Sequence, residues 1–458
     1  MNGAFLHYAA YVRKVFTMRW RPRVAGLTVL VLAALGVVVA SPAPAAAAPA
    51  SLDSAAFTLE QDFTLFNEAL AKLDSALAGR RRSVSQVMSA ANRDRQALCN
   101  QSAWQPLRDR SGTDTIGFCW QSGDDATPEW YPQGLATTRE ASANGHFDGH
   151  QLVVTSWYHK GVGVTSPDGR CPRDPEVPIT SRRPIKGVRI SLVDWDADFP
   201  NTYRHLLLVE PALTSAGQAT YRPLLTSSGE SLHAGGIAWY GSYLYVVDTS
   251  GGLRVFDFNR IYAVSTGSSD LVGRQSDGTY HAFNYAYVMP QVGRVRPVTG
   301  GLRFSFATVD RGPASAPKAL VVGEYAEDDA TARTRSRLVR FPLRSDGRLS
   351  AGADGRTVTA TAAYNTGYRQ MQGVAAYHGR YWFASSNGCR GGTVASHYGT
   401  LRFWDSSTGR TASYTWAFGP EDLSYWHDPT EGVADYLWTQ TEYLNHRAVV
   451  AVPQADWD

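Results

Sequence analysis

The sequence predicts an all-β fold assembled from repeated short strands, and three observations support this expectation. A short motif recurs along the chain, in which Gln or Ala is followed by Gly and then by small apolar and aromatic residues. Each copy is followed by a second apolar strand. Two copies continue into third strands with similar wording, Leu253–Asp257 and Leu401–Asp405. From Cys99 onward the helical spacing of hydrophobic residues disappears, and short or alternating apolar runs replace it. The copies are Gln133–Ala136, Ala234–Tyr240, Gln372–Tyr377 and, more loosely, Glu421–Tyr425.

Repeats of short strands punctuated by Gly and aromatic residues are typical of a β-propeller. The strands divide into five groups, and the last group is one strand short. Thr115–Phe118 is the candidate for the missing strand, which would pair beside Ala448–Val452 and remove an open sheet edge. We therefore expect residues 99–458 to form a five-bladed β-propeller closed by the strand at 115–118. The groups span Gly134–Glu210, Gly236–Val288, Leu302–Ala363, Gly373–Trp416 and Leu423–Val452.

Residues 1–50 have the features of a secretory signal peptide. The apolar run Val24–Ala40 follows three arginines and precedes the small residues 48–50, as expected for a basic segment, an apolar stretch and a cleavage site. The run is also nearly long enough to span a bilayer, so an uncleaved anchor is the alternative. We expect cleavage, a secreted, extracellular protein and no stable membrane insertion afterwards.

A helical segment is expected over residues 51–98. Its apolar residues recur at steps of three and four, which places them on one face of a helix. A second, weaker helix would run from Ser83 to Leu98. We expect both helices to pack against the propeller, and binding of a partner is the alternative. The apolar stripe consists of Leu59, Phe63, Phe66, Leu70, Leu73 and Leu77.

The four cysteines predict two disulfides. An even number of cysteines in an exported protein, without a Cys-x-x-Cys pair, favours disulfides over a zinc site. Three pairings are possible. We favour Cys99–Cys119 because the two residues are close in the sequence, which leaves Cys171 to pair with Cys389.

The charge of the chain argues against a nucleic-acid partner. Without residues 1–50 the chain keeps 39 basic and 41 acidic residues, and a nearly neutral surface gives no electrostatic basis for binding nucleic acid. Asp194–Asp198 has alternating acids but lacks the Gly and the Glu of a calcium loop. We expect a monomer without a metal or cofactor, whose partner is an unidentified small molecule or glycan.

Polar residues stand where the first strand of each group begins. In a propeller these strands line the central channel, so the polar side chains could converge on a ligand site. The alternative is that they cap backbone groups and hold channel water. The third group breaks the pattern, and Gln291 or Arg303 could serve there. The candidate ligand-binding residues are Gln133, His233, Gln372, Glu421 and Asp422.

Motifs of known enzyme classes do not identify a catalytic site. The chain has no nucleophile elbow, zinc-protease motif, phosphate-binding loop or dinucleotide fingerprint. Glu421 and Asp422 are adjacent on a predicted strand, so they would point to opposite faces and cannot by themselves form a glycosidase pair. A second acid would have to come from elsewhere, with Asp248, Asp310 and Glu442 as candidates.

The wording of several strands resembles a family of secreted actinobacterial β-propeller proteins. The similar stretches are Phe118–Trp120, Trp130–Gly134, His233–Trp239 and Pro420–Tyr425. This resemblance implies a location and a fold but no chemistry. The short Gln-Gly-Leu and Gly-Ile-Ala phrases are also similar to those of the five-bladed glutaminyl-peptide cyclotransferases, from which no catalytic residue can be transferred.

Two hypotheses on function remain. The first is a non-catalytic recognition propeller that binds a ligand, a carbohydrate being one candidate, in its channel or on a rim. The second is a hydrolase, lyase or cyclotransferase that uses His233 with Glu421 or Asp422 in the channel. A carboxylate within hydrogen-bond distance of His233 would favour the second hypothesis.

Overall fold

The computed structural model describes residues 47–160, 184–196, 202–388, 393–428, 430 and 433–458. These residues belong to one compact unit, Pro44–Asp458. The fold is mostly β, with 45% strand and 15% helix. None of the described helices is long and apolar enough to cross a membrane. Residues 1–46 of the expected signal peptide and the expected Cys171–Cys389 disulfide lie outside the described residues.

Most of the described strands form successive antiparallel groups of four, and each group follows the order of the chain. The first two groups are joined into one sheet by parallel pairing of their last strands. The first group is β5 (Trp130–Thr137), β6 (Leu152–His159), β7 (Val188–Asp194) and β8 (Tyr203–Leu213). The next is β10 (Ile237–Tyr240), β11 (Tyr243–Asp248), β12 (Gly252–Asp257) and β16 (Tyr287–Pro297). The third is β17 (Phe306–Asp310), β18 (Ala319–Gly323), β19 (Arg337–Pro342) and β21 (Ala362–Asn365). The fourth is β22 (Met371–Tyr377), β23 (Arg380–Ser385), β24 (Tyr398–Asp405) and β25 (Thr411–Phe418).

The last group joins the two ends of the described chain. It consists of β26 (Pro420–Trp426), β27 (Tyr436–Thr441), β28 (Val449–Pro453) and the early strand β4 (Ile116–Phe118). β4 pairs antiparallel with β28, as expected from the sequence, with Phe118 opposite Val449. Directly after β4, Cys119 forms a disulfide with Cys99. The favoured pairing of these two cysteines is therefore confirmed.

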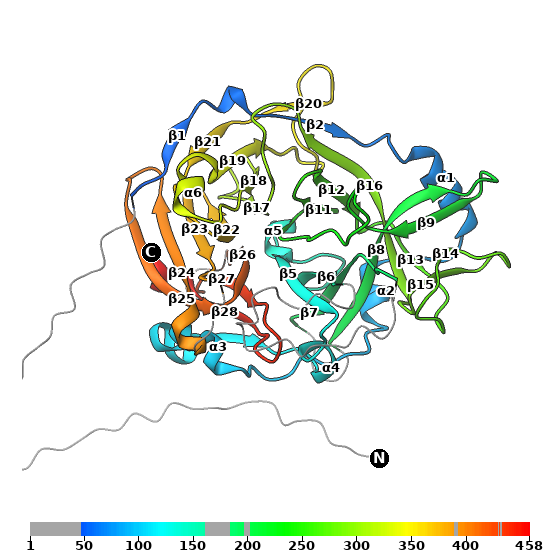
Figure 1. Ribbon diagram of the computed structural model, residues 1–458, viewed down its shortest axis with the longest axis horizontal. Coiled ribbons are helices and arrows are strands. Elements are labelled where there is room, and N and C mark those ends of the chain that lie inside the picture. The colour runs from blue at the N-terminus through cyan, green and yellow to red at the C-terminus, as the bar shows by residue number, and fades with distance from the viewer. Residues whose placement is uncertain (1–46, 161–183, 197–201, 389–392, 429, 431–432) are drawn as a thin grey trace, which may run out of the picture. The chain divides into compact units, whose positions relative to one another are not determined.

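The first strands of the groups contact one another in a closed cycle. β5 contacts β10, β10 contacts β17, β17 contacts β22, β22 contacts β26, and β26 returns to β5. Figure 1 shows β5, β17, β22 and β26 around the short helix α5 (Thr138–Ala141). The repeated glycines make this close approach possible. A Cβ atom at Gly134, Gly236 or Gly373 would lie 2.7, 2.5 or 2.5 Å from a backbone atom of the neighbouring first strand or the residue before it, so only Gly fits.

The N-terminal segment is only partly helical, which corrects the expectation for residues 51–98. It runs along the outside of the sheets and adds strands to their outer edges (Figure 1). β1 (Ala50–Leu52) pairs with β21, and β2 (Thr58–Asp62) pairs with β16 and β20 (Thr357–Thr359). β3 (Arg81–Arg82) pairs with β13 (Ile261–Ala263). The helices of this segment are α1 (Asn67–Ala76) and α2 (Val84–Met88).

Leu59 and Phe63 are not part of a helix. Leu59 is a fully buried residue of β2, and Phe63 directly follows that strand. A step of four residues fits the period of two of a strand as well as the period of a helix, so the spacing alone could not separate the two. The helical stripe begins only at Phe66 and continues through Leu70 and Leu73. The expected second helix ends at Met88 instead of Leu98.

Two outer strands also differ from the expected groups. The fourth strand of the second group is β16 and not Phe283–Val288, and that of the third group is β21 and not Val358–Ala363. The remaining described strands are β9 (Ala219–Pro223), β14 (Val272–Arg274) and β15 (Tyr280–Ala282). The remaining α-helices are α3 (Gln101–Ser111), α4 (Ser122–Asp125) and α6 (Asp329–Arg335).

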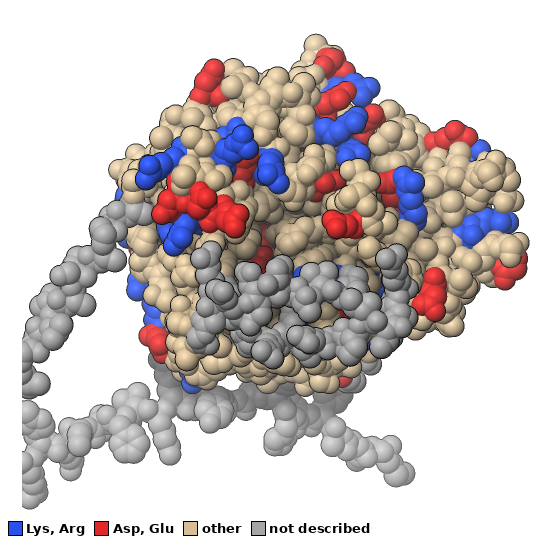
Figure 2. Space-filling view, in the orientation of Figure 1, with Lys and Arg blue, Asp and Glu red and all other residues tan. Residues whose placement is uncertain are grey.

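The hydrophobic core lies between neighbouring sheets and contains many of the aromatic residues. Trp157, Trp239, Trp382 and Trp438 are all fully or almost fully buried. At the surface, Lys and Arg are interspersed with Asp and Glu on the face shown in Figure 2. Outside the part covered by undescribed residues, that face has no large area of one charge.

Candidate functional site

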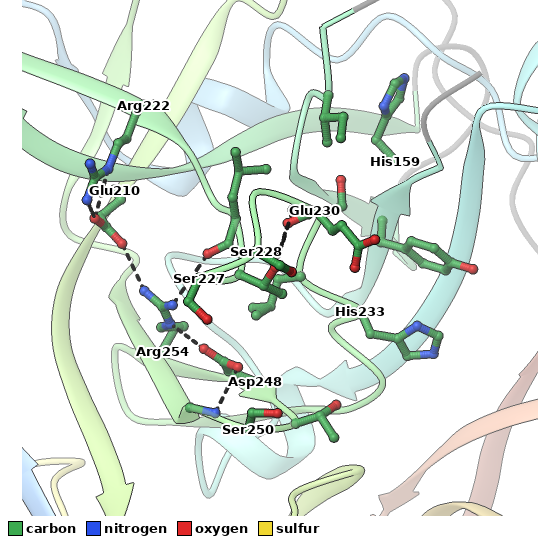
Figure 3. A pocket seen from close by; sticks show the side chains of 18 of the residues that line it. His159, Glu210, Arg222, Ser227, Ser228, Glu230, His233, Asp248, Ser250 and Arg254 are labelled. Atoms are coloured by element: carbon green, nitrogen blue, oxygen red, sulfur yellow. Dashed lines mark hydrogen bonds and ion pairs between the residues drawn. The ribbon is translucent and has the colours of Figure 1, made fainter. Parts of the chain in front are cut away.

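A polar cavity of about 890 Å³ opens between the first and second groups of strands (Figure 3). Its walls come from the end of β6, the connection between β9 and β10, and the turn between β11 and β12. The lining is rich in hydroxyl and charged groups, whereas small-molecule pockets are mostly apolar. The hydroxyl-bearing residues are Tyr158, Thr226, Ser227, Ser228, Ser231, Thr249 and Ser250.

One side of this cavity is built around Arg254 of β12 (Figure 3). Arg254 donates through Nη1 to Oε2 of Glu210 at 2.9 Å and through Nε to Oδ2 of Asp248 at 2.8 Å. The backbone amide of Gly251 donates to Oδ1 of Asp248 at 2.9 Å. The guanidinium is buried and paired with two carboxylates, of which Glu210 also pairs with Arg222 and Asp248 with Arg294. The network is therefore held in position before any ligand binds.

His233 and Tyr158 form an aromatic part of the lining. Their ring centroids lie 4.7 Å apart and the ring planes meet at 36°. Although the His233 side chain reaches solvent, the surrounding protein and the charge of Lys160 lower its pKa. No carboxylate of the described residues lies within hydrogen-bond distance of His233. The imidazole is therefore neutral at pH 7 and available for contact with a ligand.

A second set of candidate residues gathers beside the first strands as a buried carboxyl cluster. Nε2 of Gln133 donates to Oε1 of Glu442 at 2.9 Å, and Glu442 is also hydrogen-bonded to Glu421. Burial and the neighbouring Glu442 raise the pKa of Glu421 well above its usual value. A hydrogen bond between two carboxyl groups requires a proton on one of them, so this pair shares a proton at neutral pH.

Asp422 connects three of the first strands. Its Oδ2 accepts hydrogen bonds from the amides of Leu135 and Ile237, both at 3.1 Å, and its Oδ1 accepts one from the amide of Leu423 at 3.0 Å. Burial raises the pKa of Asp422 well above its usual value. The side chain is fully buried, so its role here is to satisfy backbone donors at the closed cycle of strands.

The predicted site residues therefore separate. Gln133, Glu421 and Asp422 lie at the junction of β5 and β26, whereas His233 lines the polar cavity. Gln372 is the extra residue of a bulge in β22 and shares no hydrogen bond with the other four within the described part of the chain.

The remaining candidates have other partners. Gln291 lies on β16 and accepts a hydrogen bond from Arg254 at 3.3 Å. The amide of Arg303 donates to Glu324. Of the candidate second acids, Glu442 is the one next to Glu421, while Asp248 and Asp310 are ion-paired with arginines.

Arg254 and Glu210 were not among the residues expected from the sequence, and Asp248 was expected only as a candidate second acid. A signal was present, because Leu253-Arg254 is repeated as Leu401-Arg402 at the matching place of another third strand. Arg402 also reaches back to the end of the preceding strand, where Nη1 donates to Oγ of Ser385 at 2.9 Å. The repeated Arg therefore marks a polar position on the third strand.

A buried chain of hydrogen bonds in the first group resembles a catalytic triad in its connections. Oγ of Ser191 is 2.9 Å from Nδ1 of His205, and Nε2 of His205 is 3.0 Å from Oδ1 of Asp124. Nε1 of Trp157 donates to the same Oγ at 2.8 Å. Ser191 is fully buried, so a substrate cannot reach it in this conformation. The chain of bonds serves to hold the strands together.

Comparisons with known proteins give distant structural similarity to propeller proteins and no sequence family. No protein-family profile and no curated protein sequence matches the chain. Pseudomonas fluorescens PhoX, solved in complex with vanadate as a transition-state analogue, is 10% identical with a TM-score of 0.32, covering 90% of this chain and 98% of PhoX. The Dos1 propeller is 9% identical with a TM-score of 0.24, covering 57% and 67% of the two chains. Similarities this low carry no information on ligand or activity.

Proposed function

We propose that this chain is a secreted five-bladed β-propeller that recognises a small ligand, with a neutral carbohydrate as the favoured class, in the polar cavity beside His233. The groups of four antiparallel strands and the closed cycle of their first strands support the blade count. The binding site is then the space between the first two blades, next to the channel.

The balanced charge of the cavity is the observation that carries this proposal. Arg254 pairs with Glu210 and Asp248. These two carboxylates also pair with Arg222 and Arg294, so the network offers planar, fixed hydrogen-bonding groups without a large net charge. The hydroxyl-bearing lining residues can donate and accept with little reorganisation. The rings of Tyr158 and His233 provide an apolar face for the C–H groups of a sugar. A neutral molecule with many hydroxyl groups matches all three features.

Binding to a panel of neutral and acidic oligosaccharides, followed by calorimetric titration, tests the proposal. We expect His233→Ala to weaken binding of the best neutral glycan by about tenfold, as expected for a lost contact of 1–2 kcal/mol. The free energy of unfolding should change by less than about 0.5 kcal/mol, because the side chain is exposed.

Two further variants complete this experiment. Ser228→Trp, at an exposed position of the lining, should block the cavity and abolish binding. Arg344→Ala is the matched control, since this exposed residue lies outside the cavity and, among the described residues, its ion-pair partner is Asp346. If no glycan binds, or if the cavity variants bind as the control does, the carbohydrate proposal is wrong.

The carboxyl pair of Glu421 and Glu442 supports an alternative function as a hydrolase, lyase or cyclotransferase. A carboxyl group with a raised pKa can donate a proton at neutral pH. Glu442 is only half-buried and could reach a substrate. An activity screen with Glu442→Gln separates the alternatives: loss of a detected activity with retained glycan binding would assign chemistry to this pair.

A further inference from the structure

A second cavity, of about 250 Å³, lies where several first strands end. Its lining comes from the ends of β17, β22 and β26 and from α5. Glu421, by contrast, lies at the start of β26. The second cavity is therefore distinct from both the polar cavity and the buried carboxyl cluster, and none of the residues discussed above as ligand-binding candidates lines it.

Glu140 of α5 forms the innermost part of this second cavity. Its Oε1 accepts hydrogen bonds from Oγ of Ser424 at 2.6 Å and from Oγ1 of Thr308 at 3.1 Å. The amides of Trp239 and Val309 face the carboxyl group, but Oε2 completes no hydrogen bond with the described residues. Burial raises the pKa of Glu140 to about 8, so the carboxyl group is protonated at neutral pH, while its Oε2 has no hydrogen-bond partner within the described part of the chain.

Two cations on the same cavity have no carboxylate partner among the described residues. Nη1 of Arg311 donates to the carbonyl of Glu140 at 3.1 Å, and Nζ of Lys318 donates to the carbonyl of Pro313 at 2.6 Å. Burial and the charge of Arg311 lower the pKa of Lys318. The neighbouring Asp310 is already bound by Arg340 and by the amide of His378. Arg311 also lies over the ring of Tyr240, 5.4 Å from its centroid. Two adjacent positive charges without a carboxylate favour an anion.

The facing wall of the second cavity is aromatic. Tyr377 and Tyr425 are stacked with ring centroids 4.7 Å apart, and Tyr377 lies 5.0 Å from the ring of His427. Asp435 holds this wall in place, since it accepts a hydrogen bond from the hydroxyl of Tyr425 at 2.6 Å and lies 3.0 Å from Nδ1 of His427. A wall of fixed aromatic rings suits a flat, apolar body.

We infer that this second cavity binds a small organic carboxylate with a planar body. The carboxylate would lie between Arg311 and Lys318 and accept a hydrogen bond from the protonated carboxyl group of Glu140, and the body would pack against Tyr377. The volume is below that of most drug-sized sites, which limits the ligand to a single small ring or a chain of similar size.

Calorimetric titration of the secreted protein with benzoate tests this inference, with benzamide as the neutral isostere and inorganic phosphate as the alternative anion. At about pH 6.5, where Glu140 is protonated, we expect benzoate to bind and benzamide to bind more weakly. Arg311→Gln and Lys318→Gln should each weaken benzoate binding by about tenfold or more, the loss expected for one hydrogen bond to a charged group. Arg344→Gln is the control and should bind as the wild type does.

The outcomes separate clearly. Absence of benzoate binding up to about 10 mM, an affinity too weak for a built site, would overturn the inference. Equal binding by wild type, Arg311→Gln and Lys318→Gln would place the benzoate elsewhere and would overturn it too. Phosphate binding without benzoate binding would refute the carboxylate. Should Arg311→Gln fail to fold, the half-buried Lys318 gives the deciding variant. Glycan binding by these variants should be unchanged, which separates this inference from the proposed function.

Discussion

Replacing Glu140 with Gln should stabilise the protein at neutral pH. The carboxyl group is buried beside the first strands, and burial raises its pKa from 4.5 to about 8. Folding at pH 7 must therefore add a proton to a group that is ionised in the unfolded chain. Gln keeps the acceptor for Ser424 and Thr308 and presents an amide where the protonated oxygen stood, but it needs no proton.

The size of the effect follows from the two pKa values. A carboxyl group whose pKa is raised in the folded state contributes stability that is complete below the unfolded pKa and is lost as the pH rises through the folded pKa. With 4.5 unfolded and about 8 folded, taking up the proton costs about 1 kcal/mol at pH 5, about 3 kcal/mol at pH 7 and about 4 kcal/mol at pH 8. Glu140→Gln removes this cost, so its advantage should grow with pH.

Urea unfolding of wild type and Glu140→Gln at pH 5, 7 and 8 measures this difference. The exposed Glu68, paired only with Lys72 on α1, supplies the control Glu68→Gln, which should stay within about 0.5 kcal/mol of wild type at each pH. If Glu140→Gln is destabilising at every pH, or if its stability falls with pH as steeply as that of wild type, Glu140 is ionised in the folded protein and the reasoning fails.

Two further predictions concern stability. Asp124→Ala should lower the free energy of unfolding by about 3–5 kcal/mol, because it leaves the buried guanidinium of Arg189, 3.0 Å from Asp124, without its partner; the exposed Asp277→Ala should cost far less in the same denaturation assay. Replacing Cys99 and Cys119 together with Ser should cost about 2–4 kcal/mol, and an unchanged melting temperature would show that β4 is held by pairing with β28 alone.

Local pattern and chain proximity were enough to predict much of the β structure. The repeated Gly phrases mark β5, β10 and β22 because a closed cycle of strands needs Gly at each close approach. The last predicted group had one strand fewer than the others, and the short strand Ile116–Phe118 is its fourth strand. The Cys99–Cys119 disulfide is next to that strand and joins residues only 20 apart in the sequence.

Only the tertiary structure decided the course of the N-terminal segment and the composition of the sites. Leu59 has a spacing that suits a helix or a strand, and the available edges of β16 and β20 select the strand. Arg254 meets Glu210 across the interface of two groups of strands, a contact between residues that no local pattern relates. The sequence around Glu140 does not distinguish it from a surface acid. Its carboxyl group is buried because α5 is enclosed by strands from distant parts of the chain. Period and composition report which face of an element is apolar, whereas burial of a charge depends on which distant elements surround it.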